Sequence, residues 1–181
     1  NYKKNKVFSL LTVSRIDSSE NYKGHDLIIK ALDRLINKSK LVTNIEWQIV
    51  GNGNGLNDLI KLIHKYKLEN YIKIHGNITD RKLKDIYLNS SVFIMPSHFG
   101  VKKDGFASGE GFGIVYLEAA FAGKASIACK SGGQTDLIKD KKNGILVDPS
   151  TKSISEAIYT YFKSHDLVRN HGKKARLVAE N

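Results

Sequence analysis

Short apolar runs alternate with amphipathic segments along the whole of this chain. Residues 6–16 (KVFSLLTVSRI) and 91–97 (SVFIMPS) are apolar runs without a strict apolar–polar alternation, and residues 45–51 (IEWQIVG) form another expected strand. Such runs are typical of strands that are covered on both faces. Between them, residues 24–38 and 56–68 place their apolar side chains at helical spacing. The alternation therefore predicts an α/β fold.

Strands and helices alternate about six times, and further strands are expected at residues 71–76, 124–130 and 144–148. This order predicts a doubly wound, mostly parallel six-stranded sheet with helices on both faces, which is a Rossmann-like arrangement. Residues 1–181 suit a single domain in length, and no low-complexity linker divides them. Ligands of such sheets bind at the carboxyl ends of the strands. The loops in which we expect the chemistry are therefore residues 14–24, 51–55, 76–79, 96–112 and 130–134.

The sequence also predicts where some helices begin. Thr79 is expected to be the N-cap of a helix over residues 79–90, because its hydroxyl can accept a hydrogen bond from the first turn. Ser153 and Glu156 have the spacing of a capping box and predict the start of a later helix. Residues 98–110 (HFGVKKDGFASGE) are expected to be irregular.

The formal net charge of the chain is +11, from 29 basic and 18 acidic residues. Only five of the basic residues are arginines. Because arginine dominates base readout, this composition does not favour sequence-specific nucleic-acid binding. Positive charge still favours anionic ligands or an anionic lipid surface. No apolar run approaches the length that a membrane-spanning helix needs.

Cys129 is the only cysteine, so no internal disulfide can form and a reducing compartment is indicated. Its place in the apolar run ASIACK favours a small core residue over a nucleophile. The six histidines are scattered without ligand spacing to Cys or Glu, and no Asp-x-Asp pair is present. We therefore expect no metal site.

The glycine-rich stretch GNGNG (51–55) follows a predicted strand and precedes a predicted helix, as a dinucleotide-binding fingerprint does. The third glycine of that fingerprint would fall at Leu56, and no acidic residue follows about 20 residues later. The chain also lacks the Gly-Lys-Ser/Thr of a P-loop. The plain interpretation of GNGNG is a flexible turn from strand to helix.

Two glutamates, Glu110 and Glu118, flank a Gly-Phe-Gly and a helix-forming segment. If the helix begins near Gly113, the backbone N–H groups of Gly111, Phe112 and Gly113 lie at its N-terminus, which attracts phosphate. Carboxylates accept hydrogen bonds from vicinal hydroxyls. The order carboxylate, amides, carboxylate therefore fits a nucleoside-diphosphate sugar. The simpler interpretation is an exposed helix residue and a loop charge.

The segment EGFGIVYLEAAFAGKASIACKSGGQTDLIKDKKNGILVD (110–148) closely resembles the C-terminal, donor-binding domain of retaining glycosyltransferases with two Rossmann-like domains, the GT-B architecture. The similar family is group 1, which includes bacterial mannosyltransferases and glycogen synthases, and whose hallmark is two glutamates with seven residues between them. Four further segments occur in the family's order, and the resemblance covers nearly the whole chain. They are SRIDSSENYKG (14–24), WQIVGNGNG (47–55), IKIHGNI (72–78) and FIMPS (93–97).

The resemblance implies a role for each site residue. Arg15 and Lys23 would pair with the diphosphate, since a metal-independent transferase needs fixed cations at the leaving group. Glu118 would hold the ribose hydroxyls, and Glu110 would contact the sugar. The catalytic set is then Glu110, Arg15 and Lys23, and the other donor contacts are Glu118, Gly111, Phe112, Gly113, Asn77, Ile78, Gly51 and Asn52.

Alternatives remain open for several of these residues. Arg15 could belong to a surface ion pair and Lys23 could be solvated. Asn77 and Ile78, expected to border the base, could form a plain turn before Thr79.

The resemblance further implies the donor half of a hexosyltransferase. It would use no metal cofactor and would transfer a hexose with retention from a nucleoside-diphosphate sugar to an acceptor hydroxyl. The long loop 98–109 is similar to that of mannosyltransferases, so GDP-mannose is favoured and a UDP-sugar is the alternative. We expect the acceptor, a glycan or lipid-linked sugar, to be bound mainly by an N-terminal domain outside this chain, which would be inactive alone.

Bacterial surface polysaccharide or glycolipid synthesis is the expected process. The expected location is the cytoplasm, with peripheral contact at the inner face of the membrane. Two other classes remain: a basic module that binds polyanions, nucleic acid or a membrane surface, and a GT-B-like epimerase or phosphorylase. Steep salt dependence without nucleotide preference would identify the basic module.

Overall fold

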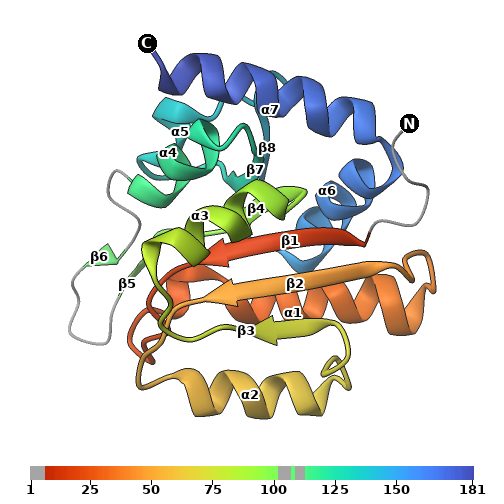
Figure 1. Ribbon diagram of the computed structural model, residues 1–181. Helices are drawn as coiled ribbons and strands as arrows, with labels where there is room; N and C mark the ends of the chain where they lie inside the picture. Colours follow the sequence, from red (N-terminus) through yellow and green to blue (C-terminus); the bar gives the residue numbers. More distant parts are fainter. Residues whose placement is uncertain (1–6, 102–106, 109–112) are drawn as a thin grey trace.

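The computed structural model describes residues 7–101, 107–108 and 113–181 of the chain (Figure 1). Six strands form one sheet in the order β3-β2-β1-β4-β7-β8, and all neighbouring strands are parallel. The strands are β1 (Phe8–Val13), β2 (Ile45–Val50), β3 (Ile72–Ile74), β4 (Val92–Met95), β7 (Ala125–Cys129) and β8 (Gly144–Val147). The predicted six-stranded, doubly wound α/β sheet is confirmed.

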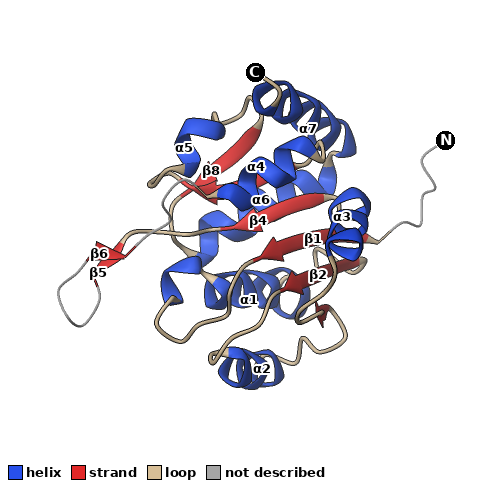
Figure 2. Ribbon diagram, turned by 60° about the vertical axis from the view of Figure 1, so that its left-hand side comes forward, coloured by secondary structure: helices blue, strands red, loops and turns tan. Residues whose placement is uncertain are grey.

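Helices cover both faces of this sheet (Figures 1 and 2). They are α1 (His25–Asp33), α2 (Leu56–Lys65), α3 (Asp80–Asn89), α4 (Ile114–Phe121), α5 (Gln134–Leu137), α6 (Thr151–Lys163) and α7 (His165–Ala179). A 3-10 turn (Asn21–Lys23) precedes α1, and a π turn (Arg34–Lys38) follows it. No helix among the described residues is both long and apolar enough to cross a membrane.

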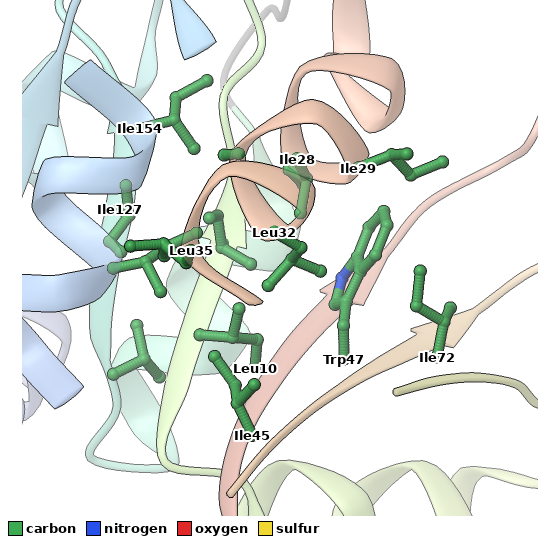
Figure 3. Close-up of a cluster of buried hydrophobic side chains, with 14 of the residues drawn as sticks. Leu10, Ile28, Ile29, Leu32, Leu35, Ile45, Trp47, Ile72, Ile127 and Ile154 are labelled. Atoms are coloured by element: carbon green, nitrogen blue, oxygen red, sulfur yellow. The ribbon is translucent and has the colours of Figure 1, made fainter. Parts of the chain in front are cut away.

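The buried side chains form one cluster on each face of the sheet. Leu10 belongs to the larger cluster, with Trp47 from β2 and with residues of α1 and α6 (Figure 3). Its neighbour Leu11 belongs to the second cluster, with Phe93 and Tyr116 on the side of α3 and α4. Because successive side chains of a strand point to opposite faces, both must be apolar when both faces are covered. This is why β1, β4 and β7 lack a polar alternation.

Two local predictions about helix starts have different outcomes. Thr79 does cap α3, because its side chain accepts a hydrogen bond from the backbone N–H of Lys82. The capping box at Ser153 and Glu156 is wrong: α6 is capped by Ser150, whose Oγ accepts from the N–H of Ser153 at 3.1 Å. Ser150 has the extended backbone of a cap, so the helix begins one turn earlier than predicted.

The segment expected to be irregular contains a small antiparallel ladder. Strands β5 (Gly100–Val101) and β6 (Ala107–Ser108) pair with each other and lie beyond the end of β4 (Figures 1 and 2). Strands of two residues are too short to show a periodicity, so the sequence offered no signal for them.

Candidate functional site

The centre of the sheet provides a point where the chain reverses its direction of winding. From β1 the sheet continues through β2 and β3 on one side, and through β4, β7 and β8 on the other. The loops that follow β1 and β4 therefore diverge at the carboxyl edge, and open α/β sheets bind ligands at such points. The loops chosen from the sequence follow the strands at this edge (Figure 1).

Backbone hydrogen bonds join these loops from one strand end to the next. The bonds run from Gly51 N–H to Gly76 O (3.0 Å), from Ile16 N–H to Asn52 O (3.0 Å) and from His98 N–H to Tyr22 O (2.9 Å). The loops after β3, β2, β1 and β4 are thus connected in series. A site built on them is positioned by the sheet and not by the loops individually.

The glycines of GNGNG are required by close packing between two loops. Gly51 has φ +139°, and a Cβ there would lie 1.8 Å from the carbonyl oxygen of Ser14. At Gly53, with φ +158°, a Cβ would lie 2.2 Å from the carbonyl oxygen of Ile16. The stretch is therefore a packed connection, which differs from the flexible turn of the plain interpretation. Asn52, predicted near the base, is exposed on this loop.

Helix α4 begins where the sequence predicted it. Gly113 is its N-cap, with φ 71° in the left-handed region, and Ile114 is its first residue. Two interactions of Tyr116 hold the helix on the sheet. Its hydroxyl donates to the carbonyl oxygen of Met95, and its ring packs edge-on against that of Phe93, with 5.3 Å between the ring centroids. The start of α4 is thereby fixed near the carboxyl end of β4.

Glu118 is an exposed residue of α4 whose carboxylate is oriented by a tyrosine of the neighbouring helix. The hydroxyl of Tyr87, on α3, donates to Glu118 Oε2 at 2.9 Å. Burial and the Glu118 carboxylate raise the pKa of Tyr87, so the phenol remains a donor. Glu118 Oε1 has no partner among the described residues and can accept from a ligand. Tyr87 was missed from the sequence, where it has the spacing of an ordinary core residue.

Arg15 and Lys23 share one carboxylate, that of Glu20. Arg15 Nη2 lies 2.5 Å from Glu20 Oε1, and Lys23 Nζ lies 2.7 Å from Glu20 Oε2. The Arg15 side chain is 76% exposed, but those of Lys23 and Glu20 are only 9% and 11% exposed. Burial raises the pKa of Glu20, but the bonds and charges of Lys23 and Arg15 outweigh it and lower the pKa overall. The surface ion pair of Arg15 is therefore present, but Lys23 is not solvated.

Two other residues of this loop region, Ser14 and His25, were not predicted from the sequence to belong to the site. His25, the first residue of α1, lies with Nε2 3.0 Å from Ser14 Oγ. Burial and the nearby Lys23 charge lower the pKa of His25 to about 4, so it is neutral at neutral pH. It can orient Ser14 but adds no positive charge to the site.

The remaining predicted residues lie in different environments. Asn77 is exposed and Ile78 is half-buried. Both lie between β3, the last strand on one side of the sheet, and Thr79, the cap of α3. The sequence positions predicted to contact the phosphate and sugar, Glu110, Gly111 and Phe112, lie outside the described residues.

A cavity of about 310 Å³ adjoins the same loops between the starts of α1 and α2. Its lining includes the carboxylates of Asp17, Glu20, Asp26 and Asp58. Four acidic groups disfavour a diphosphate by charge repulsion. Since α1 and α2 pack on the face opposite α4, this cavity is not the place where Glu118 points.

Within residues 7–101, 107–108 and 113–181, no group of three or more His, Cys, Asp or Glu side chains could hold a metal ion. Cys129 is fully buried, and its thiol lies 3.3 Å from the carbonyl oxygen of Pro96. Burial and the Asp148 charge raise the pKa of Cys129 to about 12. The prediction of a core cysteine is confirmed.

The chain is similar in sequence and in fold to known proteins. The family model described as glycosyl transferases group 1 matches residues 2–178. The chain is 29% identical over 184 residues to the GtfA subunit of a UDP-N-acetylglucosamine–peptide N-acetylglucosaminyltransferase from Streptococcus agalactiae. That match covers 96% of this chain and 32% of the relative.

A second curated relative is named for a different donor. The chain is 31% identical over 137 residues to the GDP-mannose-dependent alpha-(1-6)-phosphatidylinositol monomannoside mannosyltransferase of Mycobacterium tuberculosis, covering 75% of this chain and 34% of the relative. This chain thus spans about a third of the length of both relatives.

A similar fold occurs in the crystal structure of Anabaena HepE in complex with UDP and glucose. The TM-score is 0.78 at 22% identity, and the match covers 97% of this chain and 44% of HepE.

Proposed function

Since the chain belongs to the group 1 glycosyl transferases, we propose that it binds the nucleoside-diphosphate sugar donor for a retaining hexosyl transfer to an acceptor hydroxyl. The observation that carries the proposal is the position of Glu118. It lies on the helix that starts near the carboxyl end of β4, and Tyr87 orients it with one oxygen left for a ligand. The cations Arg15 and Lys23 follow β1, the strand that pairs with β4.

Glu118 is the proposed ribose ligand. Its Oε2 is engaged by Tyr87, so its Oε1 accepts from a ribose hydroxyl. A carboxylate has no proton to donate and suits a hydroxyl donor. The tyrosine bond limits the rotamers of the glutamate, which lowers the entropy that binding must overcome.

The diphosphate is proposed to bind between the loop after β1 and the start of α4. Arg15 supplies an exposed guanidinium, and its planar donors match phosphate oxygens. Gly111, Phe112 and Gly113 supply backbone N–H groups at the helix N-terminus, where negative charge is stabilised. No metal is required in this proposal, because these cations and amides stabilise the charge of the leaving group.

Glu110 is the proposed contact to the donor sugar, and Asn77, Ile78, Gly51 and Asn52 border the base. Retention is proposed to occur by attack on the same face as the leaving group. The acceptor oxygen bonds to the anomeric carbon, the bond from that carbon to the diphosphate oxygen breaks, and the diphosphate takes the acceptor proton. The chain then needs no nucleophilic side chain of its own.

GDP-mannose is the favoured donor and a UDP-sugar is the alternative. The two curated relatives support both, since one is named as GDP-mannose-dependent and the other as a UDP-N-acetylglucosamine–peptide transferase. The proposed process is bacterial surface polysaccharide or glycolipid synthesis at the cytoplasmic face of the membrane. The acceptor would be bound mainly by a part of the enzyme outside this chain.

A thermal-shift panel of UDP, GDP, ADP and their sugars, each measured with and without EDTA, tests the proposal. We expect one base to be preferred and the chelator to have no effect. Ligand at 100 times Kd should stabilise the fold by about 2.7 kcal/mol. Equal, strongly salt-dependent shifts with all nucleotides and with heparin would instead indicate the basic polyanion-binding module.

A further inference from the structure

We infer that Glu20 competes with the donor diphosphate for Arg15, so that binding transfers this guanidinium from the Glu20 carboxylate to a phosphate oxygen. The inference rests on the proposed function, which assigns Arg15 and Lys23 to the diphosphate. It adds a residue that the sequence did not single out. It also distinguishes the two cations: Arg15 changes its partner on binding, whereas Lys23 stays on Glu20.

The geometry of the three side chains carries this inference. Glu20 Oε1 accepts from Arg15 Nη2 at 2.5 Å, and Glu20 Oε2 accepts from Lys23 Nζ at 2.7 Å. Each carboxylate oxygen thus holds one of the two cations. A phosphate oxygen that accepts the N–H which Arg15 Nη2 now donates to Glu20 Oε1 must replace that carboxylate oxygen.

Asp17, the other carboxylate near the two cations, does not compete for Arg15 in the same way. Asp17 interacts electrostatically with Arg15 and Lys23, but its Oδ1 accepts from the backbone N–H of Ser19 at 2.8 Å and from the Ser19 hydroxyl at 2.7 Å. Those bonds fix Asp17 within its own turn. Glu20 is the carboxylate that the described residues place directly on both cations.

The two ion pairs differ in their surroundings. Arg15 is 76% exposed, and exposed ion pairs contribute little to stability, so this contact exchanges at low cost. Lys23 is 9% exposed, and separating a buried ammonium from its anion is strongly unfavourable. Glu20 therefore keeps Lys23 in place while it releases Arg15.

This division has a consequence for which anions bind. Glu20 neutralises part of the positive charge that a free phosphate would meet. A ligand must offer enough negative charge to compete with a carboxylate that is already in contact. A diphosphate carries more negative charge than a chloride or a single carboxylate and can bind several donors at once. It should therefore displace Glu20 from Arg15 more effectively than those anions do.

A double-mutant cycle on nucleotide affinity tests the inference. UDP and GDP are titrated by calorimetry into the wild-type chain, Glu20→Gln, Arg15→Ala and the double variant. We expect Arg15→Ala to weaken binding about two to five times more in the Glu20→Gln background than in the wild type. Any change in Lys23 that follows from Glu20→Gln is present in both Glu20→Gln and the double variant, so it cancels when the affinities of these two are compared.

The control variant is Glu180→Gln, which removes the 2.7 Å ion pair between Arg176 of α7 and Glu180, the residue that follows this helix. It should leave nucleotide affinity unchanged. If Glu20→Gln does not fold, Glu20→Asp replaces it, because the shorter carboxylate cannot hold both cations.

The inference is overturned if Arg15→Ala has the same effect in both backgrounds, or a smaller effect in the Glu20→Gln background. The smaller effect would mean that Glu20 positions Arg15 for the ligand. These outcomes leave the proposed function standing as long as the wild type binds and Arg15→Ala weakens binding. If neither UDP nor GDP binds the wild type, the proposed function fails with the inference.

Discussion

At the scale of single residues, the edge of this sheet is defined by polar side chains with specific partners. Tyr87 orients Glu118, and Glu20 holds Arg15 and Lys23. The Tyr87–Glu118 contact joins two helices, whereas Glu20 and Lys23 lie three residues apart in one 3-10 turn. The strength of these contacts therefore depends on the distances set by the fold as well as on the residue types.

Glu118→Ala should lose most of the affinity for the preferred nucleoside diphosphate. A hydrogen bond to a charged group contributes roughly 1.5–3 kcal/mol, which corresponds to about a 10- to 150-fold higher Kd. Tyr87→Phe should have a smaller effect, below about tenfold, because it frees the carboxylate without removing it. Calorimetry measures both, with the exposed Glu156→Ala of α6 as the control. Unchanged affinity in Glu118→Ala would refute the ribose role.

His25 predicts how stability depends on pH. Its pKa is lowered to about 4 in the folded protein, so only the unfolded chain gains a proton as the pH falls below the ordinary value of 6.5. Its contribution is therefore full above about pH 6.5 and is lost toward about pH 4. From about pH 7.5 to pH 5, we expect a loss of roughly 1 to 2 kcal/mol.

Urea unfolding of His25→Gln at the two pH values measures this contribution. The variant should show a flatter pH profile than the wild type. Some dependence should remain, because burial also lowers the pKa of His75 and His171. An identical profile in wild type and His25→Gln would contradict the assignment.

At the scale of the elements, the loops after β1, β2 and β3 behave as one packed layer. Ile16 N–H reaches Asn52 O, and Gly51 N–H reaches Gly76 O. The approach of the first two loops leaves no space for a side chain at Gly51. Loop geometry and the candidate site are therefore coupled through backbone contacts.

Gly51→Ala should destabilise the fold by roughly 2 to 3 kcal/mol, because its Cβ would overlap Ser14 O and its φ of +139° is strained for alanine. The matched control is Gly76→Ala. Gly76 also has a positive φ, +63°, but a Cβ there meets no atom within 4 Å. Its cost should be about 1 to 2 kcal/mol, from strain alone. Denaturant unfolding measures both free energies of unfolding. Equal losses in Gly51→Ala and Gly76→Ala would show that the contact between the two loops does not contribute to stability.

At the scale of the whole molecule, the chain provides a complete sheet with helices on both faces but spans about a third of its curated relatives. Each proposed donor contact lies on this chain, whereas the proposal assigns no acceptor contact to it. Nucleotide binding and sugar transfer should therefore be separable properties.

The 181-residue chain should bind the preferred nucleoside diphosphate and show negligible hexosyl transfer. The expectation follows because transfer requires the acceptor hydroxyl to be held beside the donor. Incubation with a radiolabelled sugar donor and a panel of glycan and lipid-linked acceptors measures transfer, and calorimetry measures binding on the same preparation. Robust turnover by this chain would show that it also contains an acceptor site.

The sequence by itself determined the α/β class, the six strands and the loops at the carboxyl edge that form the candidate site. It could do so because uninterrupted apolar runs and helical spacing are local patterns that burial on both faces imposes. It also determined the start of α4 at Gly113 and the burial of Cys129. The cap at Ser150 and the ladder of β5 and β6 were not predictable, since competing serines and two-residue strands give no distinctive pattern.

Only the tertiary structure decided which side chains act together. Tyr87 and Glu118 are 31 positions apart, and they meet because α3 and α4 pack on the same face. Lys23 has the sequence appearance of a solvated lysine, but the turn before α1 buries it against Glu20. Partner choice among charged and hydroxyl groups depends on distance and burial, which arise when the sheet brings its loops to one edge.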